Sequence, residues 1–91
     1  MRGLVISEHA RFEMERRQIA EEMLRQVALA PEQVVSFGKG RVIYQSQIAD
    51  RASGKKMLLR IVVEERQDAL FVVTAYKTSK IGKYWQSESE P

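Results

Sequence analysis

The chain has 91 residues, 44% of them hydrophobic, and its 15 Lys and Arg exceed its 12 Asp and Glu to give a net charge of +3. This length predicts one small domain, too short to enclose a deep active site. Without Cys and with a single His, the chain has neither a disulfide framework nor a thiolate or multi-histidine metal site. No apolar run reaches the ~18 residues of a membrane span, so we expect a cytoplasmic protein that uses no metal or cofactor.

The first third of the chain has the apolar period of helices. Leu4 to Ile6 predict a short strand, and Ser7 is placed to cap a helix over residues 8–17. A second helix is expected to start near Ala20 and to end before Pro31, because proline cannot continue a helix.

Residues after Pro31 alternate between apolar and polar side chains, as strands do. Short polar turns that indicate antiparallel hairpins separate the expected strands at 33–37, 41–48, 56–64 and 69–76. In the last strand, the odd-numbered residues from Ala69 to Ala75 are expected to face the core. The sequence therefore predicts an α+β fold with two N-terminal helices packed on an antiparallel sheet of about four strands. We expect this fold to form a single domain over residues 1–85, followed by a flexible tail at 86–91.

A candidate catalytic group lies on the first helix. His9, Glu13 and Arg17 follow one another at intervals of four residues, which places them on one stripe. A His with a carboxylate one turn away can be held in a single tautomer, as acid–base catalysis requires. The same spacing is typical of half-exposed surface pairs, which is the alternative interpretation.

Arg60 is unusual because its strand face otherwise holds Leu and Val. Antiparallel pairing is expected to bring Arg60 opposite or diagonal to Thr74 on the next strand. An unpaired buried charge is costly, so Arg60 needs either a bound anion or an ion pair with Glu64.

Basic residues are unevenly distributed, since residues 31–60 hold six Lys and Arg against two Asp and Glu. This excess predicts a polyanion as partner, and the alternative is that the cations simply solubilise edges and turns. Tyr84 and Trp85 follow nearby, where they either stack on bases or pin the end of the chain to the core. The candidate nucleic-acid-binding residues are Lys39, Arg41, Lys55, Lys56, Lys77, Lys80 and Lys83.

Short motifs are spread along most of residues 6–80: Ser7-x-His9-Ala10, Met14-x-x-Arg17-x-Ile19, Pro31-Glu32-x-Val34, Gly40-Arg41 and Val72-Val73-Thr74-x-Tyr76-Lys77. In this order and spacing they resemble a small bacterial domain family of uncharacterised function. The layout of that family is similar to the RelE- and BrnT-type toxins. The resemblance implies RNA as the substrate class and a small antitoxin protein as a partner. It also implies RNA cleavage without a metal, by attack of the ribose 2′-hydroxyl on the adjacent phosphate.

For that reaction, His9 and Tyr76 are the candidates for proton transfer. Arg17, Arg60 and Lys77 are the candidates for stabilising charge on the phosphate. The alternative function is a binding module, directed at nucleic acid or protein, that has the fold without catalysis. Catalysis requires the proton-transfer and charge-stabilising residues to share one concavity, whereas a binding module does not.

Overall fold

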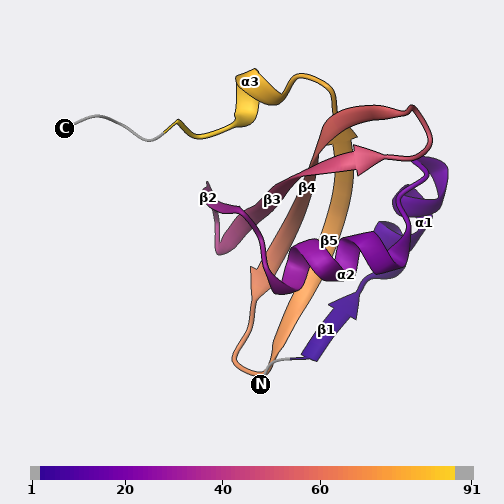
Figure 1. Cartoon of the computed structure of the whole chain (residues 1–91). Coiled ribbons are helices and arrows are strands. Elements are labelled where there is room, and N and C mark those ends of the chain that lie inside the picture. The colour runs from indigo at the N-terminus through magenta and orange to yellow at the C-terminus, as the bar shows by residue number, and fades with distance from the viewer. Residues whose placement is uncertain (1–2, 88–91) are drawn as a thin grey trace.

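The computed structural model describes residues 3–87, and its elements follow the predicted order (Figure 1). Strand β1 (Gly3–Ile6) leads into the helices α1 (Glu8–Arg16) and α2 (Glu21–Leu29). Four longer strands and a one-turn helix then follow: β2 (Gln33–Gly38), β3 (Arg41–Asp50), β4 (Lys55–Glu65), β5 (Ala69–Thr78) and α3 (Ile81–Tyr84). The predicted α+β class is confirmed.

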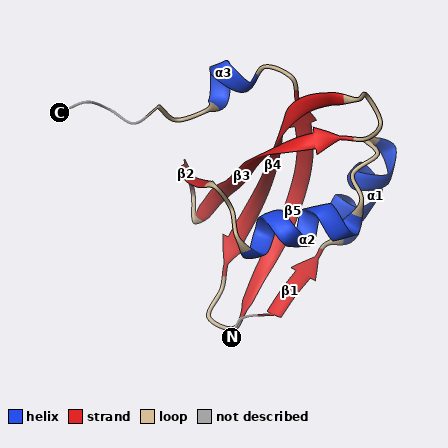
Figure 2. Cartoon of the chain, in the orientation of Figure 1, coloured by secondary structure: helices blue, strands red, loops and turns tan. Residues whose placement is uncertain are grey.

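The sheet has five strands in the order β1-β5-β4-β3-β2 (Figure 2). Strands β2 to β5 form the predicted antiparallel meander, whereas β1 pairs parallel with β5, from Gly3 opposite Ala69 to Ile6 opposite Val72. The sequence predicts the short strand but not this pairing, so the sheet is mixed rather than antiparallel. By pairing there, β1 satisfies backbone groups that the edge of β5 would otherwise expose.

Helices α1 and α2 cover one face of the sheet and enclose the main core (Figure 2). The start of α1 is fixed by Ser7, whose hydroxyl accepts from the Ala10 amide at 3.0 Å and donates to the Val73 carbonyl at 3.2 Å. The predicted cap therefore also ties α1 to β5. The helices contribute Ala10, Met14, Leu24, Val27 and Ala28 to the core, and the sheet contributes Tyr44, Ile48, Leu59, Ile61, Val63 and Val72.

Strand β5 contains a β-bulge at Val73. The pairing changes there from Val63 opposite Val72 to Val62 opposite Thr74, which leaves Val73 without a partner on β4. An extra residue shifts the alternation of side chains by one position, so the two halves of β5 bury residues of opposite parity.

The bulge changes two expectations. Leu70 is buried before the bulge and Ala75 after it, so the predicted odd-numbered core face is wrong in the first half of β5 and correct in the second. The bulge also places Tyr76 opposite Arg60, where the sequence predicts Thr74.

The second face of the sheet also buries side chains. They are Ile43, Gln45, Leu58, Arg60 and Val62. The chain after β5 lies over part of this face, where the Gln45 amide donates to the Tyr84 carbonyl at 3.2 Å and the Gln33 amide donates to the Gln86 carbonyl at 2.7 Å. Within the predicted tail, Gln86 is therefore bound to the sheet, and residues 88–91 lie outside the described residues.

Candidate functional site

Arg60 lies among neutral side chains on the sheet face opposite α1 and α2. Its Nε donates to Gln45 Oε1 at 2.8 Å, and its Nη1 donates to the Tyr76 hydroxyl at 2.6 Å. The ring of Tyr84 lies over the guanidinium, with its centroid 4.3 Å from Arg60 Cζ. We call Gln45, Arg60, Tyr76 and Tyr84 the Arg60 cluster.

The charge of Arg60 has no carboxylate partner in the described part of the chain, although the residue is only 6% exposed. Glu64, the predicted ion-pair alternative, instead binds Arg66 at 2.7 Å and Arg41 at 3.2 Å. Hydrogen bonds from Arg66 and then Arg41 hold the pKa of Glu64 below its usual value. Glu64 is therefore not the counter-ion of Arg60, and the predicted ion pair between these two residues is wrong.

One nitrogen of this guanidinium is still available to a ligand. Arg60 Nη2 makes no hydrogen bond within residues 3–87. No fully buried side-chain nitrogen or oxygen in those residues lacks a partner, so Nη2 must reach the surface. Since a buried cation is costly without compensation, the cluster can accept an anion at this nitrogen.

Tyr76 connects the Arg60 cluster to a shallow open groove at the edge of β5. Because β1 ends opposite Val72, β5 is unpaired on that side beyond this point. Since the Tyr76 oxygen accepts from Arg60, its own proton is free for another acceptor, and no residue among 3–87 takes it. The groove is lined by Arg16, Arg17, Gln18, Met57, Tyr76 and Lys77.

Arg17 fastens the end of α1 to this open edge. Its Nη1 donates to the Ala75 carbonyl at 2.8 Å, and its Nη2 lies 3.0 Å from Glu13 Oε1. Arg16 binds the same Glu13 oxygen at 2.6 Å, and this hydrogen bond is the main cause that lowers the pKa of Glu13. Arg17 and Tyr76 therefore share one groove, with Arg60 behind Tyr76.

His9 is not part of this arrangement. It is exposed in the first turn of α1, and its side chain makes no hydrogen bond within the described chain. Glu13, its predicted partner, is occupied by the two arginines. Eight residues of helix separate His9 from Arg17, which is roughly 12 Å along the axis. The four predicted catalytic residues thus divide into His9 on one side and Arg17, Arg60 and Tyr76 on the other.

Four of the predicted nucleic-acid-binding lysines lie in two segments at the same end of the sheet. The pairing of Leu58 with Thr78 brings the turn between β3 and β4 to the same end as α3 (Figure 1). Arg51, which the sequence analysis did not single out, lies in the same turn. We call this group the basic end: it comprises Arg51, Lys55, Lys56, Lys80 and Lys83, all exposed and without an ion pair to any residue among 3–87.

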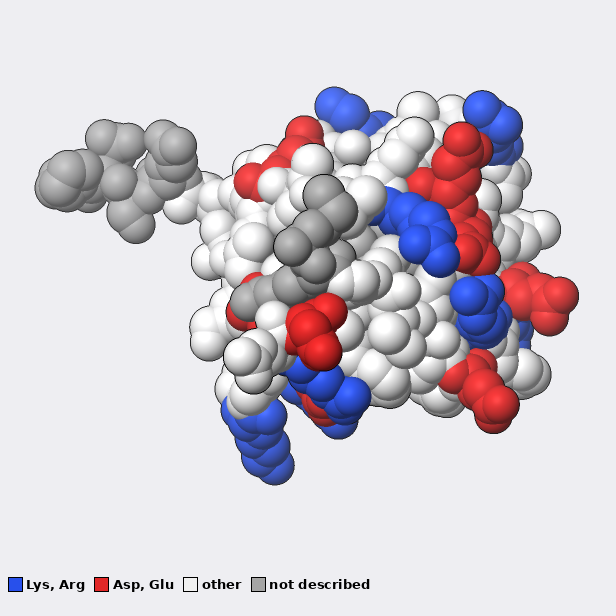
Figure 3. All heavy atoms as spheres, turned by 90° about the horizontal axis from the view of Figure 1, so that it is seen from below, with Lys and Arg blue, Asp and Glu red and all other residues white. Residues whose placement is uncertain are grey.

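The other basic residues are placed differently. Lys39 and Arg41 lie at the opposite end, around the turn between β2 and β3, and Arg41 is paired with Glu64. On the helices, Arg11 and Arg25 both bind Glu21, at 2.8 and 2.9 Å. Figure 3 shows the resulting mixture of acidic and basic side chains on the face seen from below.

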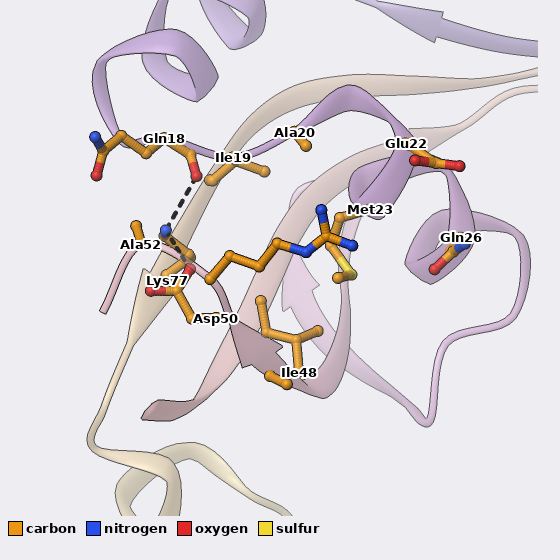
Figure 4. Close-up of a pocket in the computed structure, with 12 residues that line it drawn as sticks. Gln18, Ile19, Ala20, Glu22, Met23, Gln26, Ile48, Asp50, Ala52 and Lys77 are labelled. Carbon is orange, nitrogen blue, oxygen red and sulfur yellow. Dashed lines mark hydrogen bonds and ion pairs between the residues drawn. The ribbon is translucent and has the colours of Figure 1, made fainter. Parts of the chain in front are cut away.

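The side chain of Lys77 is largely covered, contrary to what a role as an exposed phosphate contact would require. Its Nζ lies 2.7 Å from Asp50 Oδ1 and donates to the Gln18 carbonyl at 3.1 Å, with side-chain exposures of 9% for Lys77 and 7% for Asp50 (Figure 4). The hydrogen bonds from Lys77 and then Ser53 lower the pKa of Asp50. This ion pair lines a cavity of about 270 Å³ together with Met23 and other residues of α2 and β3.

Comparison with known families gives one match. The family described as a domain of unknown function (DUF4258) matches residues 6–77. The chain belongs to this family. The matched range ends at Lys77, so it contains Arg60 and Tyr76 but not α3. The prediction of a small family of uncharacterised function is confirmed.

No curated protein sequence and no solved structure shows significant similarity to the chain. Within residues 3–87, no helix is long and apolar enough to cross a membrane. No three His, Asp or Glu side chains in that range converge as a metal site would require.

Proposed function

We propose that this domain is an RNA-binding protein of the kind represented by the RelE- and BrnT-type toxins. The observation that carries the proposal is the basic end, whose five cations have no carboxylate partner in the described chain. Cations that are not neutralised internally keep their full attraction for phosphates. A cytoplasmic location and a small antitoxin partner are part of the proposal.

The test is the salt dependence of RNA binding, measured by fluorescence anisotropy of a labelled single-stranded RNA of mixed sequence. Counterion release predicts that log K falls linearly with log salt, by about 0.7 for each neutralised phosphate. If all five cations of the basic end take part, we expect a slope of about −3 to −4. Affinity that does not change with salt, or no binding at about 50 mM salt, would contradict RNA binding and favour a protein-binding module.

RNA cleavage is a second candidate function, and the free proton of the Tyr76 hydroxyl favours it. In this reaction the 2′-oxygen attacks phosphorus and loses its proton, and the bond to the 5′-oxygen breaks as that oxygen gains one. Tyr76 is our candidate for supplying the second proton, because Arg17 lines the same groove and Arg60 donates to the Tyr76 hydroxyl. No residue that lines the groove is an ordinary base for removing the proton of the 2′-hydroxyl, since His9 lies elsewhere.

Cleavage is tested in EDTA, with and without ribosomes, by the formation of a 2′,3′-cyclic phosphate. If Tyr76 is the acid, Tyr76→Phe slows the reaction by about 10²–10⁴-fold. His9→Ala is expected to leave the rate unchanged, because His9 does not line the groove. An equal loss in both variants would bring His9 into the reaction, and an inactive wild type would remove cleavage altogether.

A further inference from the structure

We infer that residues 81–87 form a removable cover over Arg60, and that one nucleotide of single-stranded RNA takes the place of Tyr84 on the Arg60 guanidinium. The inference rests on the proposed function and specifies the RNA subsite. We call residues 81–87 the cover. Four features of the structure support it: a fixed guanidinium, a ring in the position of a base, weak attachment of the cover, and basic residues next to it.

The guanidinium of Arg60 is held in a fixed plane without being neutralised. Gln45 on β3 and Tyr76 on β5 hold its Nε and Nη1 from the two neighbouring strands. A guanidinium fixed in this way offers its flat face to an aromatic ring and its free nitrogen to a phosphate. A nucleotide supplies both groups, whereas the neutral residues around Arg60 supply only an aromatic ring.

Tyr84 occupies the position that a base would take. Its ring centroid lies 4.3 Å from Arg60 Cζ, and unpaired bases stack on arginine planes in the same manner. The Tyr84 hydroxyl makes no hydrogen bond within residues 3–87, so the contact of the side chain with Arg60 is made by the ring alone.

The cover can leave without depriving a buried polar group of all its hydrogen bonds. Helix α3 is a single turn and contains no buried residue. The cover is attached through Gln33 and Gln45, which bind the backbone of Tyr84 and Gln86. These two glutamines also bind each other at 2.7 Å, and Gln45 keeps its bond to Arg60. Both therefore stay hydrogen-bonded once the cover is gone.

Two neighbouring features fit a nucleotide at this place. Lys80 belongs to the basic end and directly precedes the cover, so RNA held by this lysine lies next to the segment that the nucleotide displaces. The family match ends at Lys77, which places Arg60 and Tyr76 inside the common domain and the cover outside it.

The experiment compares the affinity of full-length variants for a short single-stranded RNA. Tyr84→Ala removes the ring that competes with the nucleotide, so binding is expected to tighten about tenfold if the cover is open about one-tenth of the time. Tyr84→Phe keeps the ring and is expected to bind like the wild type. Trp85→Ala is the matched control, because this neighbouring aromatic makes no ring contact with Arg60.

Arg60→Met in the Tyr84→Ala background is expected to abolish the gain, since the subsite itself is then missing. Weaker or unchanged RNA binding by Tyr84→Ala, with its melting temperature close to that of the wild type, would overturn the inference. If the wild type and Tyr84→Ala bind RNA equally tightly and with the expected salt dependence, the inference fails and the proposed function stands. If neither binds RNA, the proposed function fails and the inference fails with it. Binding by Tyr84→Ala but not by the wild type would support the cover directly.

Discussion

Arg60 and Lys77 are two cations with little exposed surface on adjacent strands, and they differ in whether a carboxylate neutralises them. Lys77 lies on the helix-covered side and is neutralised by Asp50 at 2.7 Å. Arg60 lies on the other face and contacts only neutral groups, namely Gln45, Tyr76 and Tyr84. The difference teaches that burial of a charged side chain does not by itself indicate a ligand site. An internal counter-ion makes the cation structural, and the lack of one leaves it available.

The largest loss of stability is expected when Lys77 loses its counter-ion. Asp50→Asn removes the carboxylate and leaves the Lys77 ammonium buried without a counter-ion, which costs about 3–5 kcal/mol of unfolding free energy. The double variant Asp50→Asn with Lys77→Met removes both charges and is expected to recover most of the loss. Urea denaturation measures both values. A loss below about 1 kcal/mol in the single variant would show that the pair is effectively solvated.

A smaller effect on stability is expected at the other cation. Arg60→Met leaves only neutral partners behind, chiefly the Gln45 amide oxygen, at a cost of about 1–3 kcal/mol. RNA affinity is expected to fall as well, whereas the Asp50→Asn, Lys77→Met pair should bind RNA as the wild type does. If Arg60→Met destabilised the domain as much as Asp50→Asn, Arg60 would have to be neutralised by an acid, against the comparison.

Variants at the two cations are expected to differ in how their stability changes with pH. The pKa of Asp50 is lowered in the folded state, mainly by Lys77. A lowered carboxyl pKa contributes stability above the unfolded value, near 4, and this contribution is lost as the pH falls through the folded pKa. The double variant at Asp50 and Lys77 should therefore lose less stability between about pH 5 and 2 than the wild type. Arg60→Met should keep the full acid dependence, and melting temperatures across this range provide the measurement.

The sequence predicts those parts of the fold that depend on local chemistry. The Ser7 cap, the end of α2 before Pro31 and the succession of helices and strands along the chain all follow from residue type and spacing. The bulge at Val73 does not, because its flanking residues are as apolar and β-branched as their neighbours. Because the sequence does not indicate the bulge, it does not predict that Arg60 pairs with Tyr76.

The candidate site is predicted only in part, for a related reason. A count of charges treats every lysine alike, so it does not distinguish the largely covered Lys77 from exposed Lys55. The counter-ion of Lys77 comes from Asp50, which is 27 residues away and is brought near by the sheet. Gln45 is likewise one of several polar residues on its strand, and its bond to Arg60 depends on the register between β3 and β4.

The most direct test of the account compares cations that are neutralised with cations that are not. Lys55→Gln with Lys56→Gln removes two positive charges from the basic end, and Arg11→Gln with Arg25→Gln removes two that are bound to Glu21. Both double variants change the net charge equally. We predict that the lysine variant binds single-stranded RNA more weakly and reduces the log–log salt slope by about 1.4, whereas the arginine variant keeps the wild-type slope. Equal reductions in the two variants would contradict the account, since binding would then follow net charge and not the lack of internal counter-ions.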